Sequence, residues 1–224
     1  MRVARQIPAV VLLVTASLSC ATIAASVAVP PPAVDAALAA KPGQATAVVA
    51  GGCFWGVQAV FQHVRGVVRA TSGYAGGTAQ SARYEIVSAG ETGHAESVEI
   101  VYDPSVITYG RLLRVFFAVA HDPTELNRQG PDEGRQYRSA IFTSTSEQAR
   151  IARAYIDQLN AAKVFARKVV TEVATLPAFY AAEAYHQDYA TRHPDDLYIR
   201  INDAPKVENL RATFPELWMP SIAR

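Results

Sequence analysis

The chain has 224 residues, of which half are hydrophobic, and its formal net charge is +1 at neutral pH. This length is enough for one globular domain with a single core. Its 21 basic residues are nearly matched by 20 acidic residues, which excludes the strongly basic surface that nucleic-acid binding requires. We therefore expect one domain that binds no nucleic acid, and we expect it to be a monomer.

Residues 1–28 have the pattern of an export signal. Arg2 and Arg5 form a short basic head, and the apolar stretch 7–18 behind it is too short to span a membrane as a stable helix. Small residues up to Ala28 suit cleavage by a signal peptidase. We therefore expect an exported protein that resides in the bacterial periplasm.

Cys20 leaves a second fate of this leader open. A cysteine just after an apolar stretch can become the lipid-modified first residue of a lipoprotein, but Ser17 occupies the position where such sites usually carry leucine. The segment 29–44 is rich in proline and alanine and has no amphipathic period. It predicts a flexible linker before a folded domain at 45–224.

Apolar periodicity predicts three elements at the start of this domain. A short apolar run at 45–50, ending in two glycines, is typical of a buried strand. Apolar residues then recur at helical spacing over 54–64, and Gly66 follows where a helix would end. The segment 66–73 predicts a second strand.

Further along the chain, three elements continue this pattern: a strand at 95–102 that ends before a proline, a helix at 109–120 and a strand at 137–143. The helix has Leu112, Leu113, Phe116 and Phe117 as its core stripe. The spacing of Ser144 and Glu147 predicts a capping box that opens another helix, and 169–173 predicts a further strand.

The first six elements run strand, helix, strand, strand, helix, strand, which is the order of a split β-α-β plait. This order predicts an α+β fold, specifically a ferredoxin-like two-layer sandwich with its helices on one face of a sheet. The segment 179–218 shows no regular period. We expect it to form an irregular C-terminal extension that wraps the sheet.

Cys53 is the first candidate for chemistry, within Gly-Gly-Cys-Phe-Trp-Gly at 51–56. It falls between a predicted strand and a predicted helix, and a helix N-terminus lowers the pKa of a thiol by stabilising the thiolate. From the residues alone, Cys53 could equally be a small buried apolar residue, as most free cysteines are. Phe54 and Trp55 are either walls of an apolar pocket beside the thiol or ordinary core residues.

Glu96, in Gly-His-Ala-Glu at 93–96, is the second candidate. It shares a strand face with Val98, Ile100 and Tyr102, so burial of that face would place a carboxyl in apolar surroundings. Burial raises the pKa of a carboxyl, which allows it to act as a general acid near neutral pH. If the strand lies at an edge of the sheet, Glu96 is instead an ordinary solvated side chain.

A polar loop at 129–139, flanked by glycines, leads into the strand that ends at 143. Loops in this position commonly line sites. Tyr137 and, earlier in the chain, Tyr84 carry phenols that can donate a hydrogen bond to a polarised oxygen. Each of them could equally be an amphipathic residue at the rim of the domain.

Four segments together resemble the peptide methionine sulfoxide reductase A family: Gly-Cys-Phe-Trp-Gly at 52–56, Gly-His-Ala-Glu at 93–96, Arg-Gln-Gly-x-Asp at 128–132 and Gln-Tyr-Arg-Ser at 136–139. The likeness continues through Ala182-Glu183 and 185–189. It implies that 45–224 is the catalytic domain of an oxidoreductase that repairs oxidative damage. The implied reaction reduces the S epimer of methionine sulfoxide, in proteins or free, to methionine.

The resemblance also implies roles for individual residues. Cys53 would attack the sulfoxide sulfur and become a sulfenic acid, while Glu96 would protonate the oxygen. The other implied site residues support these two: Tyr84 and Tyr137 by hydrogen bonds to the oxygen, Asp132 through bound water, and Phe54 and Trp55 by enclosing the methyl group.

The cysteine count departs from that of the commonest family members, many of which carry one or two further cysteines near the C-terminus. This chain has two cysteines in all, Cys20 and Cys53, and Ser88 stands where many relatives have cysteine. Once Cys20 is cleaved off or lipidated, no second thiol remains to resolve the sulfenic acid. We therefore expect no bound cofactor and an external thiol reductant, either a thioredoxin-like protein or a small thiol.

Two other functions remain open from the sequence. A cysteine hydrolase or acyltransferase would need a histidine next to Cys53, and His94, His121 and His186 are the candidates. A non-enzymatic exported binding module would hold Cys53 as an inert core residue. We expect no metal site, because the five histidines show no paired ligand spacing.

Overall fold

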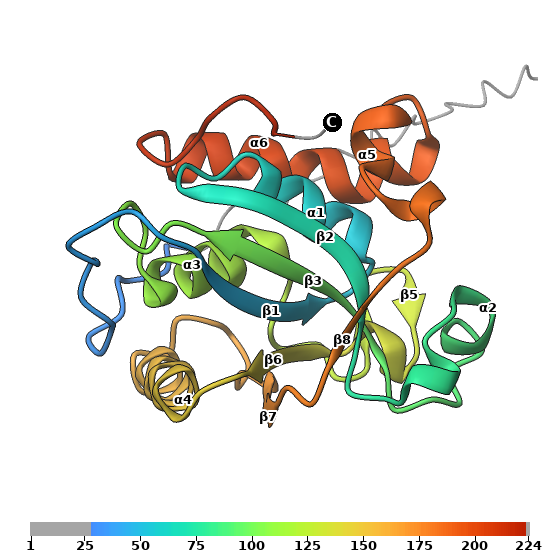
Figure 1. Ribbon diagram of the computed structural model, residues 1–224, viewed down its shortest axis with the longest axis horizontal. Helices are drawn as coiled ribbons and strands as arrows, with labels where there is room; N and C mark the ends of the chain where they lie inside the picture. Colours follow the sequence, from blue (N-terminus) through green and yellow to red (C-terminus); the bar gives the residue numbers. More distant parts are fainter. Residues whose placement is uncertain (1–27, 223–224) are drawn as a thin grey trace, which may run out of the picture.

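A curved mixed sheet forms the centre of the protein in the computed structural model, which describes residues 28–222 (Figure 1). The strand order is β7-β6-β1-β3-β2-β8, and a separate two-stranded hairpin contains β4 and β5. The fold is therefore mixed α/β. Residues 1–27 of the predicted export signal, including Cys20, lie outside the described range.

The four inner strands pair antiparallel with one another: β6 (Ser139–Thr143), β1 (Ala45–Gly51), β3 (Ala95–Tyr102) and β2 (Val67–Ala75). The remaining strands are short: β7 (Glu172–Thr175) parallel to β6, β8 (Phe179–Ala181) antiparallel to β2, and the hairpin of β4 (Arg128–Gln129) and β5 (Asp132–Glu133). The predicted strands at 45–50, 66–73, 95–102 and 137–143 are confirmed. Some boundaries differ from the prediction: β2 continues through Tyr74 to Ala75. The further strand expected at 169–173 begins only at Glu172.

The longer helices are α1 (Phe54–Gln62), α3 (Tyr109–Val115), α4 (Ser146–Ala161) and α6 (Ala204–Thr213). The shorter ones are α2 (Tyr84–Val87), α5 (Tyr189–Arg192), the 3₁₀ turns η1 (Ala79–Ser81), η3 (Arg135–Tyr137) and η4 (Ala184–His186), and the π-helices η2 (Phe116–Ala120) and η5 (Ile199–Asp203). The helix predicted at 109–120 is confirmed as α3 followed by η2, and its four core residues are buried. Among residues 28–222, no helix is both long and apolar enough to cross a membrane.

The capping box of α4 lies one residue beyond the predicted position. Thr145 is the N-cap, and its hydroxyl accepts a hydrogen bond from the N–H of Gln148. The Gln148 side chain in turn accepts a hydrogen bond from the N–H of Ser144. Thr145 and Gln148 therefore take the places predicted for Ser144 and Glu147.

Successive side chains of β1 point to opposite faces of the sheet. Ala47 and Val49 join the main core, which also contains Val57 of α1 and Leu112 of α3. Val48 and Ala50 join a smaller apolar cluster around Phe142 on the other face. Burial on both faces fixes the register of β1, at whose C-terminal end Cys53 lies.

The C-terminal part is more regular than expected, because it contains α5, η5 and the ten-residue helix α6. Figure 1 shows α6 lying alongside α1, against which it packs. In α6 itself, Leu210 is the one residue that is fully buried. An apolar stripe is therefore missing from its sequence, which explains why periodicity did not reveal the helix.

Residues 29–44, predicted as a flexible linker, have no helix or strand but contact the domain closely. Arg114 donates a hydrogen bond to the carbonyl of the buried Val29, and the Tyr155 hydroxyl donates one to the carbonyl of Pro30. The prediction from composition did not include these contacts. The segment lies along α3 and α4 and caps one of them.

Asp35 forms that cap, because its carboxylate accepts hydrogen bonds from the Thr108 hydroxyl and the Gly110 N–H at the start of α3. Asp35→Ala should lower the free energy of unfolding by about 1–2 kcal/mol, as measured by urea denaturation. The exposed Glu91 gives a matched control, and Glu91→Ala should change the same free energy by less than about 0.5 kcal/mol. Equal urea midpoints for the two variants would contradict the capping role.

Candidate active site

Cys53 is the N-cap residue of α1, and one residue, Gly52, separates it from the end of β1. Gly52 before it has φ +85°, a left-handed conformation that glycine adopts without strain. A Cβ atom on Gly52 would lie 2.5 Å from the side chain of Gln129. The chain therefore requires glycine at this turn, and the thiol, 8% exposed, is held beneath a closely packed loop.

The pKa of Cys53 is raised well above its ordinary value. Burial is the largest cause, and the charges of Glu96 and Asp203 act in the same direction, whereas the Trp55 N–H and Lys206 oppose them. The expectation that the helix N-terminus would favour a thiolate is therefore wrong here, because desolvation and two carboxylates outweigh the helix N–H groups. The resting group is a thiol.

Glu96 lies on β3, an inner strand, and is 3% exposed. Its Oε2 accepts a hydrogen bond of 3.1 Å from the backbone N–H of Phe54. Burial raises the pKa of Glu96 to about 8; the Phe54 hydrogen bond opposes this rise, and Asp132 and Asp203 add to it. The expected buried carboxyl is confirmed, and at neutral pH it carries a proton that it can donate.

Adjacent N–H groups in the first turn of α1 serve these two side chains. The N–H of Phe54 donates to Glu96, and the N–H of Trp55 donates to the Cys53 sulfur. Both N–H groups lack partners within the helix. The helix end therefore places an acid and a thiol next to each other in one buried site, called the pocket below.

Tyr84 and Tyr137 approach the same pocket from two other elements. Tyr84 begins α2, and Tyr137 ends η3. The pKa of each phenol is raised, first by burial and then by Glu96, and Cys53 contributes in both cases. Both hydroxyls are therefore protonated hydrogen-bond donors near the thiol and the acid.

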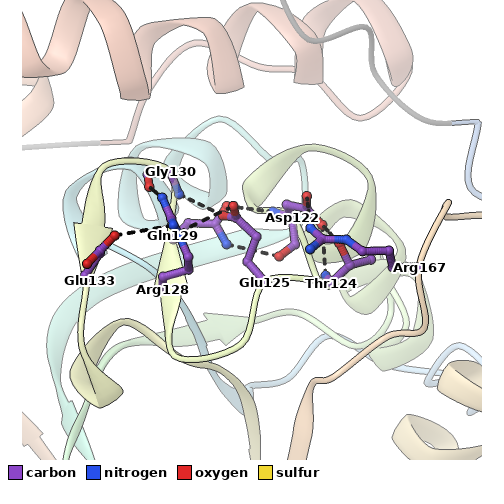
Figure 2. A network of polar contacts seen from close by, with 8 residues as sticks. All are labelled: Asp122, Thr124, Glu125, Arg128, Gln129, Gly130, Glu133 and Arg167. Atoms are coloured by element: carbon purple, nitrogen blue, oxygen red, sulfur yellow. Dashed lines mark hydrogen bonds and ion pairs between the residues drawn. The ribbon is translucent and has the colours of Figure 1, made fainter.

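Asp132 lies on β5 and accepts a hydrogen bond from the hydroxyl of Tyr198. Its hairpin belongs to the polar network in Figure 2. There the Gln129 side chain bonds both the N–H and the carbonyl of Asp122, and the N–H of Gly130 donates to Glu125. This network fixes Gln129 against Gly52 and Asp132 at the pocket.

Arg128 extends the same network across the hairpin in Figure 2. It pairs with Glu125 at 3.8 Å and with Glu133 at 3.3 Å, and it also donates to the carbonyl of Gly130. All three contacts lie near the surface, where single ion pairs stabilise little. Their combined effect is to brace a short hairpin that has no apolar core of its own.

Trp55 forms an aromatic wall of the pocket. Its ring stacks on Tyr189 with centroids 3.8 Å apart, and its indole N–H donates to Nδ1 of His186 at 3.2 Å. Phe54, beside it, is buried against Tyr74 and His186. The two residues expected to bind substrate therefore lie together next to Cys53, fixed by neighbours on several elements.

Sequence reasoning missed three residues at the site, Tyr189, Tyr198 and Asp203, and it named a fourth, His186, only as a candidate base for a hydrolase. Tyr189 and His186 are the two that it could have assigned from the family resemblance. Both fall in the segment 185–189, which carried the resemblance. Tyr198 and Asp203 lie in the part of the chain without apolar periodicity, so no local pattern indicates them. Asp203 is fully buried, and its carboxylate lies 3.0 Å from the Lys206 ammonium.

The histidines that a cysteine hydrolase would need are engaged elsewhere. His94 bonds the carbonyl of Thr78, and His186 accepts from Trp55. His121 bonds Ser139, and burial lowers the pKa of its ring to about 3. In the part of the chain that the structure describes, no histidine hydrogen-bonds to Cys53, so the base for nucleophilic activation is missing.

Residues 28–222 also contain no cluster of metal-ligand side chains. No three histidine, cysteine, aspartate or glutamate side chains gather there as they would around a metal ion. The chemistry open to the pocket is therefore that of a buried thiol, a protonated carboxyl and two phenols.

Alkylation of native Cys53 tests this electrostatic arrangement. The rate should be low at pH 7 and rise only above pH 9, because the thiol pKa is raised above that value. Asp203→Asn should move the midpoint to lower pH, since it removes a negative charge that opposes the thiolate. As a control, Asp195→Asn removes an exposed charge and should leave the midpoint of the alkylation rate at its wild-type pH. A wild-type midpoint in Asp203→Asn would show that Asp203 does not act on the thiol.

Comparison with known proteins agrees with this chemistry. The family model for peptide methionine sulfoxide reductase matches residues 45–217. The chain is 59% identical over 179 residues to peptide methionine sulfoxide reductase MsrA 2 of Mesorhizobium japonicum, covering 80% of this chain and 92% of that protein. It is 50% identical over 190 residues to the protein of the same name from Synechocystis, covering 84% and 89%.

Two solved structures share the fold. The reduced form of Mxr1 from Saccharomyces cerevisiae superposes with a TM-score of 0.62 at 31% identity, covering 71% of this chain and 90% of that one. Methionine sulfoxide reductase A of Corynebacterium diphtheriae gives 0.59 at 38% identity, covering 69% and 77%. The chain belongs to the peptide methionine sulfoxide reductase family.

Proposed function

We propose that this protein reduces the S epimer of methionine sulfoxide, free or within oxidised proteins, to methionine at Cys53. The observation that carries the proposal is the first turn of α1, where adjacent N–H groups hold a buried thiol and a buried protonated carboxyl. A sulfoxide needs both groups, because its sulfur accepts a nucleophile only as its oxygen gains a proton. Family membership supports the same reaction.

The reaction balances without an added proton. The Cys53 sulfur supplies an electron pair to the sulfoxide sulfur, and Glu96 protonates the sulfoxide oxygen. The sulfur–oxygen bond of the substrate breaks and methionine leaves, while the oxygen ends on Cys53 as a sulfenic acid. The thiol proton replaces the one that Glu96 gave, so Cys53 is oxidised by two electrons and the substrate is reduced by two.

The remaining residues orient the substrate. Tyr84 and Tyr137 are protonated donors placed to hydrogen-bond the sulfoxide oxygen, and Asp132 orders the polar side of the pocket through Tyr198. Phe54 and Trp55 enclose the methyl group on the apolar side. Donors on one side and rings on the other favour one arrangement of oxygen and methyl around sulfur, and thus one epimer.

An external thiol returns Cys53 to its reduced form in this proposal. Cys53 is the free cysteine of the described residues, and the chain's other cysteine, Cys20, belongs to the predicted leader. A thioredoxin-like protein or a small thiol attacks the sulfenic acid and releases water. A second thiol of the reductant then breaks the mixed disulfide.

Export to the bacterial periplasm is part of the proposal. The basic head and short apolar stretch of 1–28 support it. Lipidation at Cys20 is the alternative. The mass of the mature N-terminal peptide distinguishes a cleaved signal from a lipidated Cys20.

We also infer that the inner strands form a ferredoxin-like split β-α-β unit. Their order, β6-β1-β3-β2, and their antiparallel pairing support this description. The strands β7 and β8 then extend the unit at its two edges.

A single turnover tests the proposed reaction. Protein lacking residues 1–28, mixed with an equal amount of a peptide containing methionine S-sulfoxide and no reductant, should yield one methionine per enzyme. Cys53 should become a sulfenic acid that dimedone traps, as read by mass spectrometry. Cys53→Ser should give neither product, since a serine hydroxyl cannot donate the two electrons that the sulfoxide accepts.

Two results would contradict the proposal. Methionine formation by Cys53→Ser would remove Cys53 from the reaction. In protein that keeps residues 1–28, a disulfide between Cys20 and Cys53 after turnover would replace the single-cysteine cycle. The R epimer serves as the matched control substrate, and it should remain unreduced.

A further inference from the structure

Glu183 links two elements that meet at the active site. It lies between β8 and η4, and its carboxylate accepts hydrogen bonds on both oxygens. The Tyr74 hydroxyl donates to Oε2 at 2.8 Å, and the backbone N–H of Tyr84 donates to Oε1 at 2.9 Å. One side chain therefore connects β2 to the start of α2.

The Tyr74 end of this link is rigid. Tyr74 is fully buried, its ring packs against Phe54, and it pairs directly with Glu96 across β2 and β3. Glu183 is thus anchored to the strand pair that carries the acid. Burial would raise the pKa of Glu183, but the hydrogen bonds from Tyr84 and Tyr74 outweigh it and lower the pKa, so the anchor is a carboxylate at neutral pH.

The Tyr84 end depends on such an anchor. The helix α2 has four residues, and a helix of that length does not hold itself together in water. The Tyr84 ring also contacts the His186 ring, with centroids 4.4 Å apart, and His186 comes from the same segment as Glu183. Without these contacts the Tyr84 hydroxyl would have no fixed distance from Cys53 and Glu96.

We propose that Glu183 is a positioning residue for sulfoxide reduction, whose carboxylate holds the Tyr84 hydroxyl at the substrate oxygen by fastening α2 to Tyr74. The inference rests on the proposed function, because it requires Tyr84 to act on the sulfoxide. Glu183 itself touches no reacting atom. Its effect on the reaction therefore passes through the Tyr84 hydroxyl.

A double-mutant cycle on kcat/KM for a methionine S-sulfoxide peptide tests this dependence. Glu183→Ala should lower kcat/KM about tenfold, mainly through kcat, because a misplaced donor loses its bond in the transition state. In the Tyr84→Phe background, the same substitution should change kcat/KM by less than about twofold. The melting temperature should fall equally in both backgrounds, since the structural contacts of Glu183 do not need the Tyr84 hydroxyl.

Two further variants control the cycle. Glu183→Gln keeps an acceptor for the Tyr84 N–H, and its amide can donate to the Tyr74 oxygen, so kcat/KM should return close to the wild-type value. Glu85→Ala removes an exposed charge beside Tyr84 and should not reproduce the loss. If Glu183→Ala does not fold, Tyr74→Phe can replace it, because this variant breaks one half of the link. It should lower kcat/KM by less than Glu183→Ala would, and it should have no effect on kcat/KM in the Tyr84→Phe background.

A tenfold loss that persists in the Tyr84→Phe background would overturn the inference, because Glu183 would then act independently of Tyr84. Full activity of Glu183→Ala, or of Tyr84→Phe alone, would overturn it as well. A wild-type protein that reduces no sulfoxide would instead overturn the proposed function, together with the inference that rests on it.

Discussion

The active site depends on two neighbouring N–H groups at the start of α1. They compensate for part of the cost of burying a thiol and a carboxyl. A helix end is one of the few places in a protein core with unsatisfied donors to offer. Because Glu96 takes the N–H of Phe54 while burial keeps its proton on, the pocket holds an acid and a nucleophile without mutual repulsion.

Much of the remaining structure keeps this helix end in place. On one side, Gln129 packs over Gly52 and is fixed by the polar loop that bonds it to Asp122. On the other side, Gln187 bonds both the N–H and the carbonyl of Ser72 on β2 and accepts a hydrogen bond from Gln58 of α1. These side-chain amides join α1, the sheet and the C-terminal segment into one unit around the thiol.

The raised pKa of Cys53 follows from the same arrangement. A helix terminus ordinarily favours a thiolate, but burial and the nearby carboxylates prevail here. A thiol that stays protonated in the resting protein is less exposed to oxidation by other routes, because the thiolate is the reactive form.

The sequence predicted the elements around Cys53 because their apolar residues follow strand and helix periods. Parity placed Glu96 on the same strand face as Val98, Ile100 and Tyr102, but whether that face was buried stayed open until β3 proved to be an inner strand. The direction of the Cys53 pKa shift could not be predicted, because it depends on the burial of the site and on Asp203, which comes from the far end of the chain. α6 was missed since it buries little besides Leu210, and its position follows from packing on α1.

The seven residues implied by the family resemblance lie near one another in the structure, which apolar periodicity alone could not have established. Tyr84 and Tyr137 come from short elements with no periodic signal, and Asp132 comes from a two-residue strand. Their convergence depends on tertiary contacts such as those of Glu183 and Gln129. Local sequence patterns carry no information about contacts of this kind.

The protonation state of Glu96 is the most direct test of a buried general acid beside the thiol. Carbon-13 NMR of protein labelled at glutamate carboxyl groups, with Glu96→Gln to identify the signal, follows this group through a pH titration. We expect a neutral carboxyl at pH 7 and a midpoint near pH 8. A midpoint near 4.5, the ordinary value for glutamate, would contradict the central claim, because Glu96 would then have no proton to give at neutral pH.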